Sequence, residues 1–295
     1  MHMEQHEVIK SILAAKNYTN VFPDLKNWSG LYKTYAKQIH PDVCKLPNGS
    51  DALAKLNRFK DEINNGIKHK DDAGDIICKP YSITITGTPK LLKKSLDNWK
   101  ILMSYTDSGA KHFQKYLPET GQILPDGKLE FTFYDRAVPL ATLGVLPHEH
   151  VNWITNRMLE IAAWISEKGF VHCGINPDSV FIMPENHGAI LTSFYHMTKI
   201  DDKVTTVSGR YKNFYPLYLF TNKKAAPSID NELIKRTATY VLGDRSGSGT
   251  KLRKTHNIEI LDYLKKTDHN ALASMELHKK VVKKNFETKY HILNA

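Results

Sequence analysis

The stretch of sequence that decides the fold runs from Gly169 to Phe194 and reads GFVHCGINPDSVFIMPENHGAILTSF. Two apolar runs, VFIM and AILTSF, flank the turn-forming residues PENHG, which is the pattern of a short antiparallel hairpin. The preceding residues, HCGINPD, are mostly polar or turn-forming and include a proline, so they predict a loop. Alone, the stretch therefore predicts a helix end, a tight loop and two short strands.

In its context this stretch resembles the catalytic region of the protein kinase fold. There, His-Arg-Asp, two residues, Pro, two residues and a strand hairpin lead to Asp-Phe-Gly. The residues that occupy matching positions are His172, Pro177, Val180, Ile182, Ile190, Leu191 and Phe194. Residues 129–143 resemble the last strand of the smaller kinase lobe and the hinge, and residues 147–172 resemble the two helices before the catalytic loop. The resemblance covers about residues 75–265.

The positions that carry out chemistry in kinases hold other residues in this sequence. The resemblance places Gly174 at the catalytic base, Asn176 at the catalytic-loop lysine, and Ser179 and Ser193 at the two metal ligands, with Tyr195 at the glycine of Asp-Phe-Gly. Phosphoryl transfer depends on metal ions that neutralise the phosphates, so losing both ligands removes the main electrostatic contribution. We therefore expect a pseudokinase without enzymatic activity, cofactor or metal.

The region before residue 129 lacks the other kinase signatures. No glycine-rich phosphate loop lies near residues 74–90. Lys93 could stand for the kinase strand lysine, but there is no glutamate between Glu62 and Glu119 to pair with it.

Three residues of the kinase-like part are interpreted as scaffold. We expect His172 and Phe194 to be buried and to hold the loop. Asp230, in PSIDNEL, either anchors that loop through its backbone, as an acidic residue does in kinases, or caps a helix.

Residues 1 to about 66 read as three amphipathic helices, in MEQHEVIKSILAAKN, NWSGLYKTYAKQI and SDALAKLNRFKDEINNG. We expect Asn27 or Ser29 to cap the second helix, Ser50 or Asp51 to cap the third, and residues 64–66 to end it. Strand-like sequence starts near residue 74. The predicted fold class is α+β, with a helical module at 1–68 and a domain at 75–295, whose lobes cover about 75–134 and 138–295. The boundary is expected near KHKDDAGD.

The second helix ends in LYKTYAKQIHPD, and Pro41 must stop it because proline disfavours helix at the residue before it and donates no hydrogen bond. The triplet His40-Pro41-Asp42 is then either an ordinary helix stop or a surface that a partner binds. The sequence resembles the J-domain family of DnaJ-type co-chaperones, whose second helix reads AYRKLAKQYHPD and whose third carries Phe and Ile, here Phe59 and Ile63. The resemblance covers about residues 5–66, and the usual Ala-Tyr is replaced by Gly66-Ile67.

This second resemblance implies docking onto a DnaK-like 70-kDa heat-shock chaperone and stimulation of its ATP hydrolysis. Asp42 would present a carboxylate on a rigid turn to a cation of the partner, and nearby lysines would steer the encounter. The residues expected to bind the chaperone are Tyr32, Lys33, Lys37, His40, Pro41 and Asp42.

Composition favours an acidic partner, because 41 Lys and Arg against 31 Asp and Glu give a net charge of +10. Cys44, Cys78 and Cys173 are too far apart for a zinc or redox motif, which favours a reduced, intracellular setting. No signal peptide or apolar run of membrane-spanning length is present, so we expect a cytoplasmic protein, in the host cytoplasm if the source is viral.

Three other motifs are set aside. GDRSGSGTK, residues 243–251, has the wrong order for a phosphate loop and is expected to be a flexible loop, with anion binding as the weaker alternative. KLRKTH and HKKVVKKNFETKY could contact nucleic acid, but we favour solvated faces with Val281, Val282, Phe286 and Tyr290 buried beneath. His148 and His150 are two apart, which does not suit a metal site on one helix face.

The sequence therefore predicts a co-chaperone. Its first module would recruit and stimulate the chaperone, and its kinase-like domain would bind a protein client, scaffold an assembly or dimerise. The alternatives are a nucleotide-binding atypical kinase-like protein and a basic nucleic-acid-binding protein.

Overall fold

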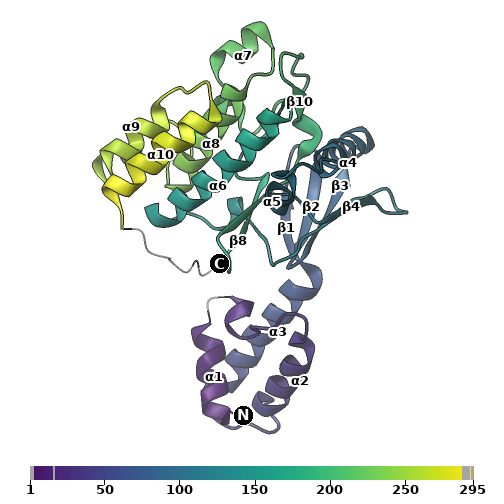
Figure 1. Cartoon of the computed structure of the whole chain (residues 1–295). Coiled ribbons are helices and arrows are strands. Elements are labelled where there is room, and N and C mark those ends of the chain that lie inside the picture. The colour runs from purple at the N-terminus through teal and green to yellow at the C-terminus, as the bar shows by residue number, and fades with distance from the viewer. Residues whose placement is uncertain (1–2, 16, 288–292, 294–295) are drawn as a thin grey trace. The chain divides into compact units, whose positions relative to one another are not determined.

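A computed structural model describes residues 3–15, 17–287 and 293 of the chain (Figure 1). Within these residues the chain forms two compact units, the first ending at Lys68 and the second running from His69 to Leu293. The predicted boundary segment, residues 68–75, carries most of one strand and the start of the next. None of the helices in the described part of the chain combines the length and hydropathy that a bilayer-spanning segment needs.

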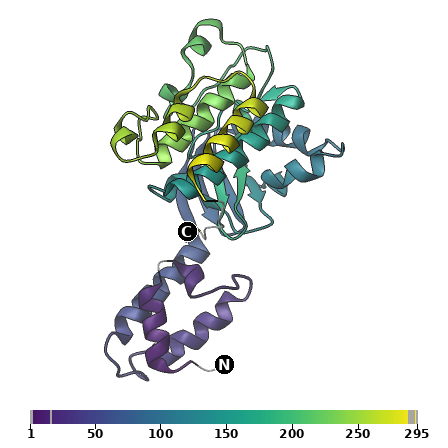
Figure 2. The same ribbon diagram turned by 60° about the vertical axis from the view of Figure 1, so that its left-hand side comes forward.

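The first unit consists of the helices α1 (Gln5–Ala14), α2 (Trp28–Ile39) and α3 (Gly49–Asn65) and the short 3₁₀ helix η1 (Tyr18–Asn20) (Figure 2). Their apolar stripes meet in a small core that includes Val8, Ile12, Ile39, Leu56 and Phe59. The helices lie where the amphipathic pattern predicted them.

The ends of these helices differ in part from the prediction. Gly66, with φ of 74° and ψ of 171°, ends α3 in a positive-φ conformation that glycine tolerates. The cap of α3 is Asn48 rather than Ser50 or Asp51, because the helix begins earlier, at Gly49. Asn27 occupies the cap position of α2 but makes no side-chain capping bond.

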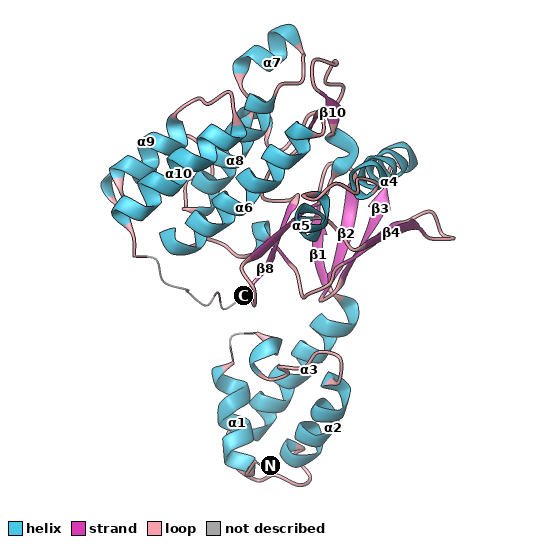
Figure 3. Cartoon of the chain, viewed as in Figure 1, coloured by secondary structure: helices cyan, strands magenta, loops and turns pink. Residues whose placement is uncertain are grey.

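An antiparallel sheet in the order β1-β2-β3-β5-β4, coloured magenta in Figure 3, starts at the boundary of the two units, which falls inside β1. Its strands are β1 (Ile67–Lys70), β2 (Gly74–Lys79), β3 (Ser82–Gly87), β4 (Thr120–Ile123) and β5 (Leu129–Thr132). The helix α4 (Pro89–Met103) packs on β3, β4 and β5, where the rings of Trp99 and Phe131 lie 5.7 Å apart. The strand-like pattern did not reveal β1 and β4, which are the two edges of the sheet.

The rest of the second unit is mainly helical. Its helices are α5 (Ala110–Phe113), α6 (His148–Glu167), α7 (Leu217–Asn222), α8 (Pro227–Val241), α9 (Ile258–Lys265) and α10 (Ala271–Asn285). Its strands are β6 (Val138–Pro139), β7 (Phe170–Val171), β8 (Val180–Met183), β9 (Gly188–Leu191) and β10 (Thr198–Lys199). The 3₁₀ helices are η2 (Gln114–Tyr116), η3 (Leu140–Thr142), η4 (Phe194–His196), η5 (Lys212–Phe214) and η6 (Lys251–Lys254).

The predicted hairpin is confirmed, since β8 and β9 pair antiparallel with Phe181 opposite Ile190. The expectation of two helices before the loop was wrong. The helix α6 is continuous, because residues 148–167 contain no glycine or proline to interrupt it. It packs against α8 and α10 and supports the loop that follows.

Candidate functional site

The side chain of Asp230 on α8 anchors the loop after β7 through hydrogen bonds to its backbone. The backbone N–H groups of His172 and Cys173 donate hydrogen bonds to the two carboxylate oxygens of Asp230, at 2.7 and 2.8 Å. Burial raises the pKa of Asp230 to about 7, although both N–H groups act to lower it. The expected backbone anchor is present. A capping role is excluded, because Ala226 caps α8 and Asp230 lies inside the helix.

The two predicted scaffold residues lie in the core of this region. His172 and Phe194 are fully buried, with ring centroids 5.5 Å apart. Nε2 of His172 lies 2.9 Å from the carbonyl oxygen of Thr192. Burial lowers the pKa of His172 to about 3, so this imidazole is neutral near pH 7 and ties the loop to the end of β9.

Asn176 and Ser179 use their polar atoms within the loop. The Ser179 hydroxyl donates to the carbonyl of Gly174 at 2.8 Å, and the Asn176 amide donates to the same carbonyl at 3.0 Å. The Asn176 side-chain oxygen accepts from the N–H of Asp178 at 2.9 Å. Both side chains are buried, so they shape the loop and present no ligand atom to solvent.

Gly174 leaves no room for a catalytic side chain. A Cβ atom built at this position would lie 2.5 Å from Cδ2 of His196, well inside the closest real contacts. The ring of His196 therefore fills the space beside Gly174, the residue that the sequence resemblance aligns with the catalytic base.

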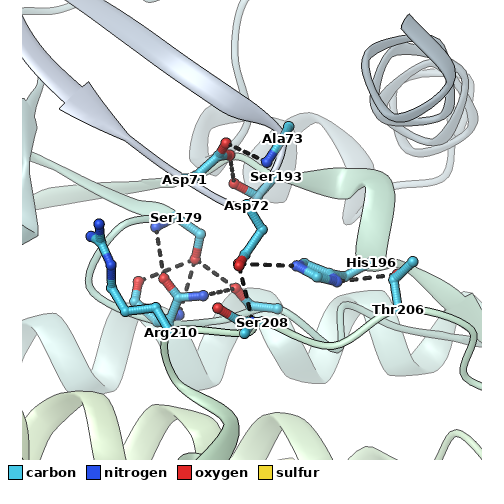
Figure 4. Close-up of polar contacts among 12 residues, drawn as sticks. Asp71, Asp72, Ala73, Ser179, Ser193, His196, Thr206, Ser208 and Arg210 are labelled. Carbon is cyan, nitrogen blue, oxygen red and sulfur yellow. Dashed lines mark hydrogen bonds and ion pairs between the residues drawn. The ribbon is translucent and has the colours of Figure 1, made fainter. Parts of the chain in front are cut away.

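Ser193 contacts a carboxylate from the β1–β2 turn. Its backbone has φ of 61°, and its hydroxyl donates to Oδ2 of Asp71 at 2.7 Å (Figure 4). The other oxygen of Asp71 accepts from the N–H groups of Ala73 and Gly74, at 2.8 and 3.2 Å. The turn is thus folded with the Asp71 carboxylate buried against Ser193.

Asp72, the next residue, reaches the segment after η4. One of its oxygens accepts from the N–H of Gly209 at 2.9 Å, and the other lies 3.9 Å from Nε2 of His196. Burial alone would raise the pKa of Asp72, but the nearby His196 and Ser208 side chains and the hydrogen bond from the N–H of Gly209 lower it below its ordinary value. Asp72 is therefore ionised near pH 7.

A second cluster closes the neighbouring side of the loop. The carboxylate of Asp178 accepts from Nη1 of Arg210 at 2.7 Å and from the hydroxyl of Tyr211 at 3.0 Å, and Nε2 of His69 lies 3.7 Å away. Burial raises the pKa of Asp178, although His69, Arg210 and Tyr211 each act to lower it. This cluster could not be predicted from the sequence, because each partner of Asp178 lies 32 or more positions away from it.

No model of a known sequence family and no curated protein sequence matches the chain. Among solved structures, the chain is similar to vaccinia related kinase 3, with a TM-score of 0.51 and 9% identity over 75% of this chain and 91% of that one. The chain has a protein-kinase-like fold. Because the first unit ends at Lys68, an alignment of this length must include most of the second unit.

The β1–β2 turn, KDDAG, folds back so that Asp71 and Asp72 lie against Ser193, Gly209 and His196. Two carboxylates at this place repel phosphate and take up hydrogen-bond donors that a phosphate would need.

Lys93 does not take the place of the kinase strand lysine. This residue lies on α4, where it pairs with Asp97 one helical turn away, and not on a strand. The neighbouring strand β3 reads SITITG and contains no lysine. Within the described residues, no cluster of three His, Cys, Asp or Glu side chains could hold a metal ion.

The glycine-rich segment 243–251 is organised around its own carboxylate. Asp244 is fully buried and accepts hydrogen bonds from the hydroxyls of Ser246 and Ser248 and from the N–H of Lys251. These three donors are engaged by the Asp244 carboxylate and are therefore not available to a bound anion.

The C-terminal basic helix differs from the expected packing. Ala271, Ser274 and His278 of α10 are buried, whereas Val281 and Val282 are only half-buried. Val281 and Val282 continue the same helical face as Ser274 and His278, so burial along this face decreases towards the C-terminal end of α10. Phe286 is also half-buried and lies beside the ring of His148, and Tyr290 lies outside the described residues.

In the first unit, the His-Pro-Asp triplet forms an exposed turn after α2. The side chain of Asp42 is 86% exposed, and its Oδ2 lies 3.3 Å from Nδ1 of His40. The N–H groups of Val43 and Cys44 donate to the His40 carbonyl, and the Lys45 ammonium donates to the Pro41 carbonyl at 2.8 Å. These bonds fix the backbone and leave the Asp42 carboxylate in solvent.

The helix α2, which precedes this turn, has one exposed basic face and one face that packs within the first unit. Lys33 and Lys37 are exposed on α2, and Ile39 is buried. Tyr32, also expected to contact a partner, is half-buried and donates its hydroxyl to Asn57 on α3 at 2.7 Å. Tyr32 therefore joins α2 to α3, and the exposed lysines form the polar face.

Proposed function

We propose that this protein is a co-chaperone that recruits a DnaK-like 70-kDa chaperone and stimulates its ATPase through His40, Pro41 and Asp42. The kinase-like unit serves as a catalytically inactive module that binds a protein client or scaffolds an assembly. This proposal combines the J-domain resemblance of residues 5–66 with the kinase-like fold.

The observation that carries the proposal is the display of Asp42. An 86% exposed carboxylate stands on a turn whose backbone is fixed by local hydrogen bonds. Lys33 and Lys37 are exposed on the helix that leads into the turn. A carboxylate fixed in this way can form a charge-assisted bond with a partner's cation, and the lysines can steer an acidic surface towards it.

Reversing both lysines is expected to weaken recruitment. With Lys33→Glu/Lys37→Glu, we expect the concentration for half-maximal ATPase stimulation to rise by about tenfold or more at low salt, because like charges then oppose docking. The maximal stimulation should change little, because Asp42 is intact. Phosphate release by the chaperone at increasing concentrations of each variant measures both quantities.

A matched control separates docking from net charge. Lys10→Glu/Lys26→Glu changes the net charge equally at exposed sites outside α2. An equal rise in the half-maximal concentration for both pairs would contradict a docking role for α2.

We also propose that the kinase-like unit neither binds MgATP nor transfers phosphate. Support comes from Gly174, Ser179 and Ser193 at the chemical positions and from Asp71 and Asp72 in the β1–β2 turn. A ligand present at about 100 times its Kd would stabilise the unit by about 2.7 kcal/mol. That stabilisation corresponds to a rise in Tm of roughly 5–10 °C for a domain of this size.

We therefore expect millimolar MgATP to raise the Tm by less than about 1 °C, measured by differential scanning fluorimetry. MgADP and ATP with EDTA serve as comparisons. A shift of several degrees with MgATP would favour the alternative function, a nucleotide-binding kinase-like protein.

A further inference from the structure

A groove runs along the side of α7 in the kinase-like unit. It encloses about 390 Å³ between the segment 203–207 and the helix, which contributes Leu219 and Phe220, with Lys223 just after its end. The helix α7 lies at the top of Figure 1.

One wall of the groove is backbone with unused hydrogen-bond donors. Lys203 and Lys224 form an antiparallel bridge, and the N–H of Val204 donates to the Lys223 carbonyl at 2.7 Å, after which the pairing stops. Within the described part of the chain, no hydrogen bond engages the N–H of residues 205, 206 or 207. Residues 204–208 contain no helix, turn or bend. An unpaired stretch of this kind can accept an added strand.

The segment is also held in place from behind. The Thr206 hydroxyl lies 3.1 Å from Nδ1 of His196 and 3.4 Å from the carbonyl of Tyr195. Because this side chain is fixed to the loop after β9, the segment offers a preformed edge, and a partner would lose less ordering entropy on pairing with it.

The other wall supplies apolar surface. Phe220, which lines the groove, is 38% exposed, and Leu217, at the start of α7 and outside the groove lining, is 86% exposed. The ammonium of Lys212 lies 5.4 Å from the centre of the Phe220 ring. Exposed apolar side chains beside a groove are typical of an interaction surface.

The charge around the groove is predominantly positive. Lys203 and Lys223 line it, Lys212 and Lys224 are exposed beside it, and no carboxylate is among its lining residues. The nearest acidic residues along the chain, Asp201 and Asp202, lie on the turn before the segment. The preferred occupant is therefore negatively charged.

We propose that this groove binds an extended peptide in which acidic and apolar residues alternate. The peptide pairs its backbone with residues 205–207, places apolar side chains against Leu219 and Phe220, and directs its carboxylates to Lys203 and Lys223. This inference deepens the proposed client-binding role and rests on it, since it names the chemical class of the client segment.

Fluorescence anisotropy with the full chain tests the proposal. The probe is a labelled octapeptide of alternating Glu and Val, compared with a Lys-Val octapeptide, the Glu-Val peptide with N-methylated backbone, and an oligothymidylate of equal charge. We expect the Glu-Val peptide to bind at least about tenfold more tightly than each of the others, because only it offers both charge and a pairing backbone. Equal binding of the N-methylated peptide or of the oligothymidylate would overturn the proposal.

Variants locate the site. Lys203→Glu/Lys223→Glu is expected to weaken Glu-Val binding by about tenfold or more, whereas Lys100→Glu/Lys115→Glu, an equal charge change on other exposed lysines, leaves it intact. Equal weakening by both pairs would overturn the assignment to this groove.

The same preparations separate this proposal from the co-chaperone proposal. Absent peptide binding together with Asp42-dependent ATPase stimulation would overturn the groove alone. Peptide binding together with absent stimulation would overturn the co-chaperone function and leave the groove standing.

Discussion

Replacing Asp230 by asparagine is expected to lower the free energy of unfolding of the kinase-like unit by about 3 kcal/mol, because a buried N–H without an acceptor costs about 1–3 kcal/mol. The carboxylate accepts from the N–H groups of both His172 and Cys173. An asparagine offers only one oxygen, and its NH₂ group would face the second donor. Urea unfolding of the full chain, followed by circular dichroism, measures the difference.

The control for this experiment is Asp75→Asn. Asp75 is 77% exposed and pairs loosely with Lys70 at 3.4 Å, so its substitution should change stability by less than about 0.5 kcal/mol. Equal stability of Asp230→Asn and Asp75→Asn would contradict the anchoring role.

The effect of Asp230 should also depend on pH. Burial raises its pKa from an ordinary value of 3.8 to about 7 in the folded protein. The folded state therefore holds the proton more tightly than the unfolded state. The associated stabilisation is complete below about pH 3.8 and is lost as the pH rises through about 7. The stability difference between wild type and Asp230→Asn should thus be larger at pH 5 than at pH 8.

The largest functional effect is expected for Asp42→Asn. Losing one charge-assisted bond in the docked state is worth about 2 kcal/mol, which corresponds to about a thirtyfold loss of stimulation. The fold should be unaffected, because the Asp42 side chain is 86% exposed and contacts only His40. Steady-state phosphate release by the chaperone measures the first effect, and thermal unfolding checks the second.

Asp61→Asn, on the exposed side of α3, is the matched control and should stimulate as wild type does. His40→Gln should behave like Asp42→Asn if the turn acts as a unit. A loss of stimulation shared by Asp61→Asn would point to a general charge effect and contradict the specific role of the turn.

Features set by neighbouring residues could be predicted from the sequence. The β8–β9 hairpin was predicted because PENHG separates two apolar runs, and the end of α3 because Asn-Asn-Gly stops a helix. The strands β1 and β4 were not predicted, because edge strands such as IKHK carry few apolar residues. The sequence did not show whether Lys93 lies on a strand or on a helix, because a lysine next to apolar residues is compatible with both.

Features made by distant residues could not be predicted. The contact between Asp71 and Ser193 joins residues 122 positions apart, and only the folding of the β1–β2 turn onto the loop creates it. The same is true of His196, whose ring fills the space beside Gly174. The sequence could show which kinase residues are missing, but not which side chains occupy their places.

A single-turnover measurement of ATP hydrolysis tests the central claim most directly. A DnaK-like chaperone is loaded with one equivalent of labelled ATP and mixed with an excess of the full chain or of its Asp42→Asn variant. We predict that the full chain raises the hydrolysis rate constant by about tenfold or more and that the variant leaves it near the value of the chaperone alone. Equal acceleration by both proteins, or none by either, would contradict the account.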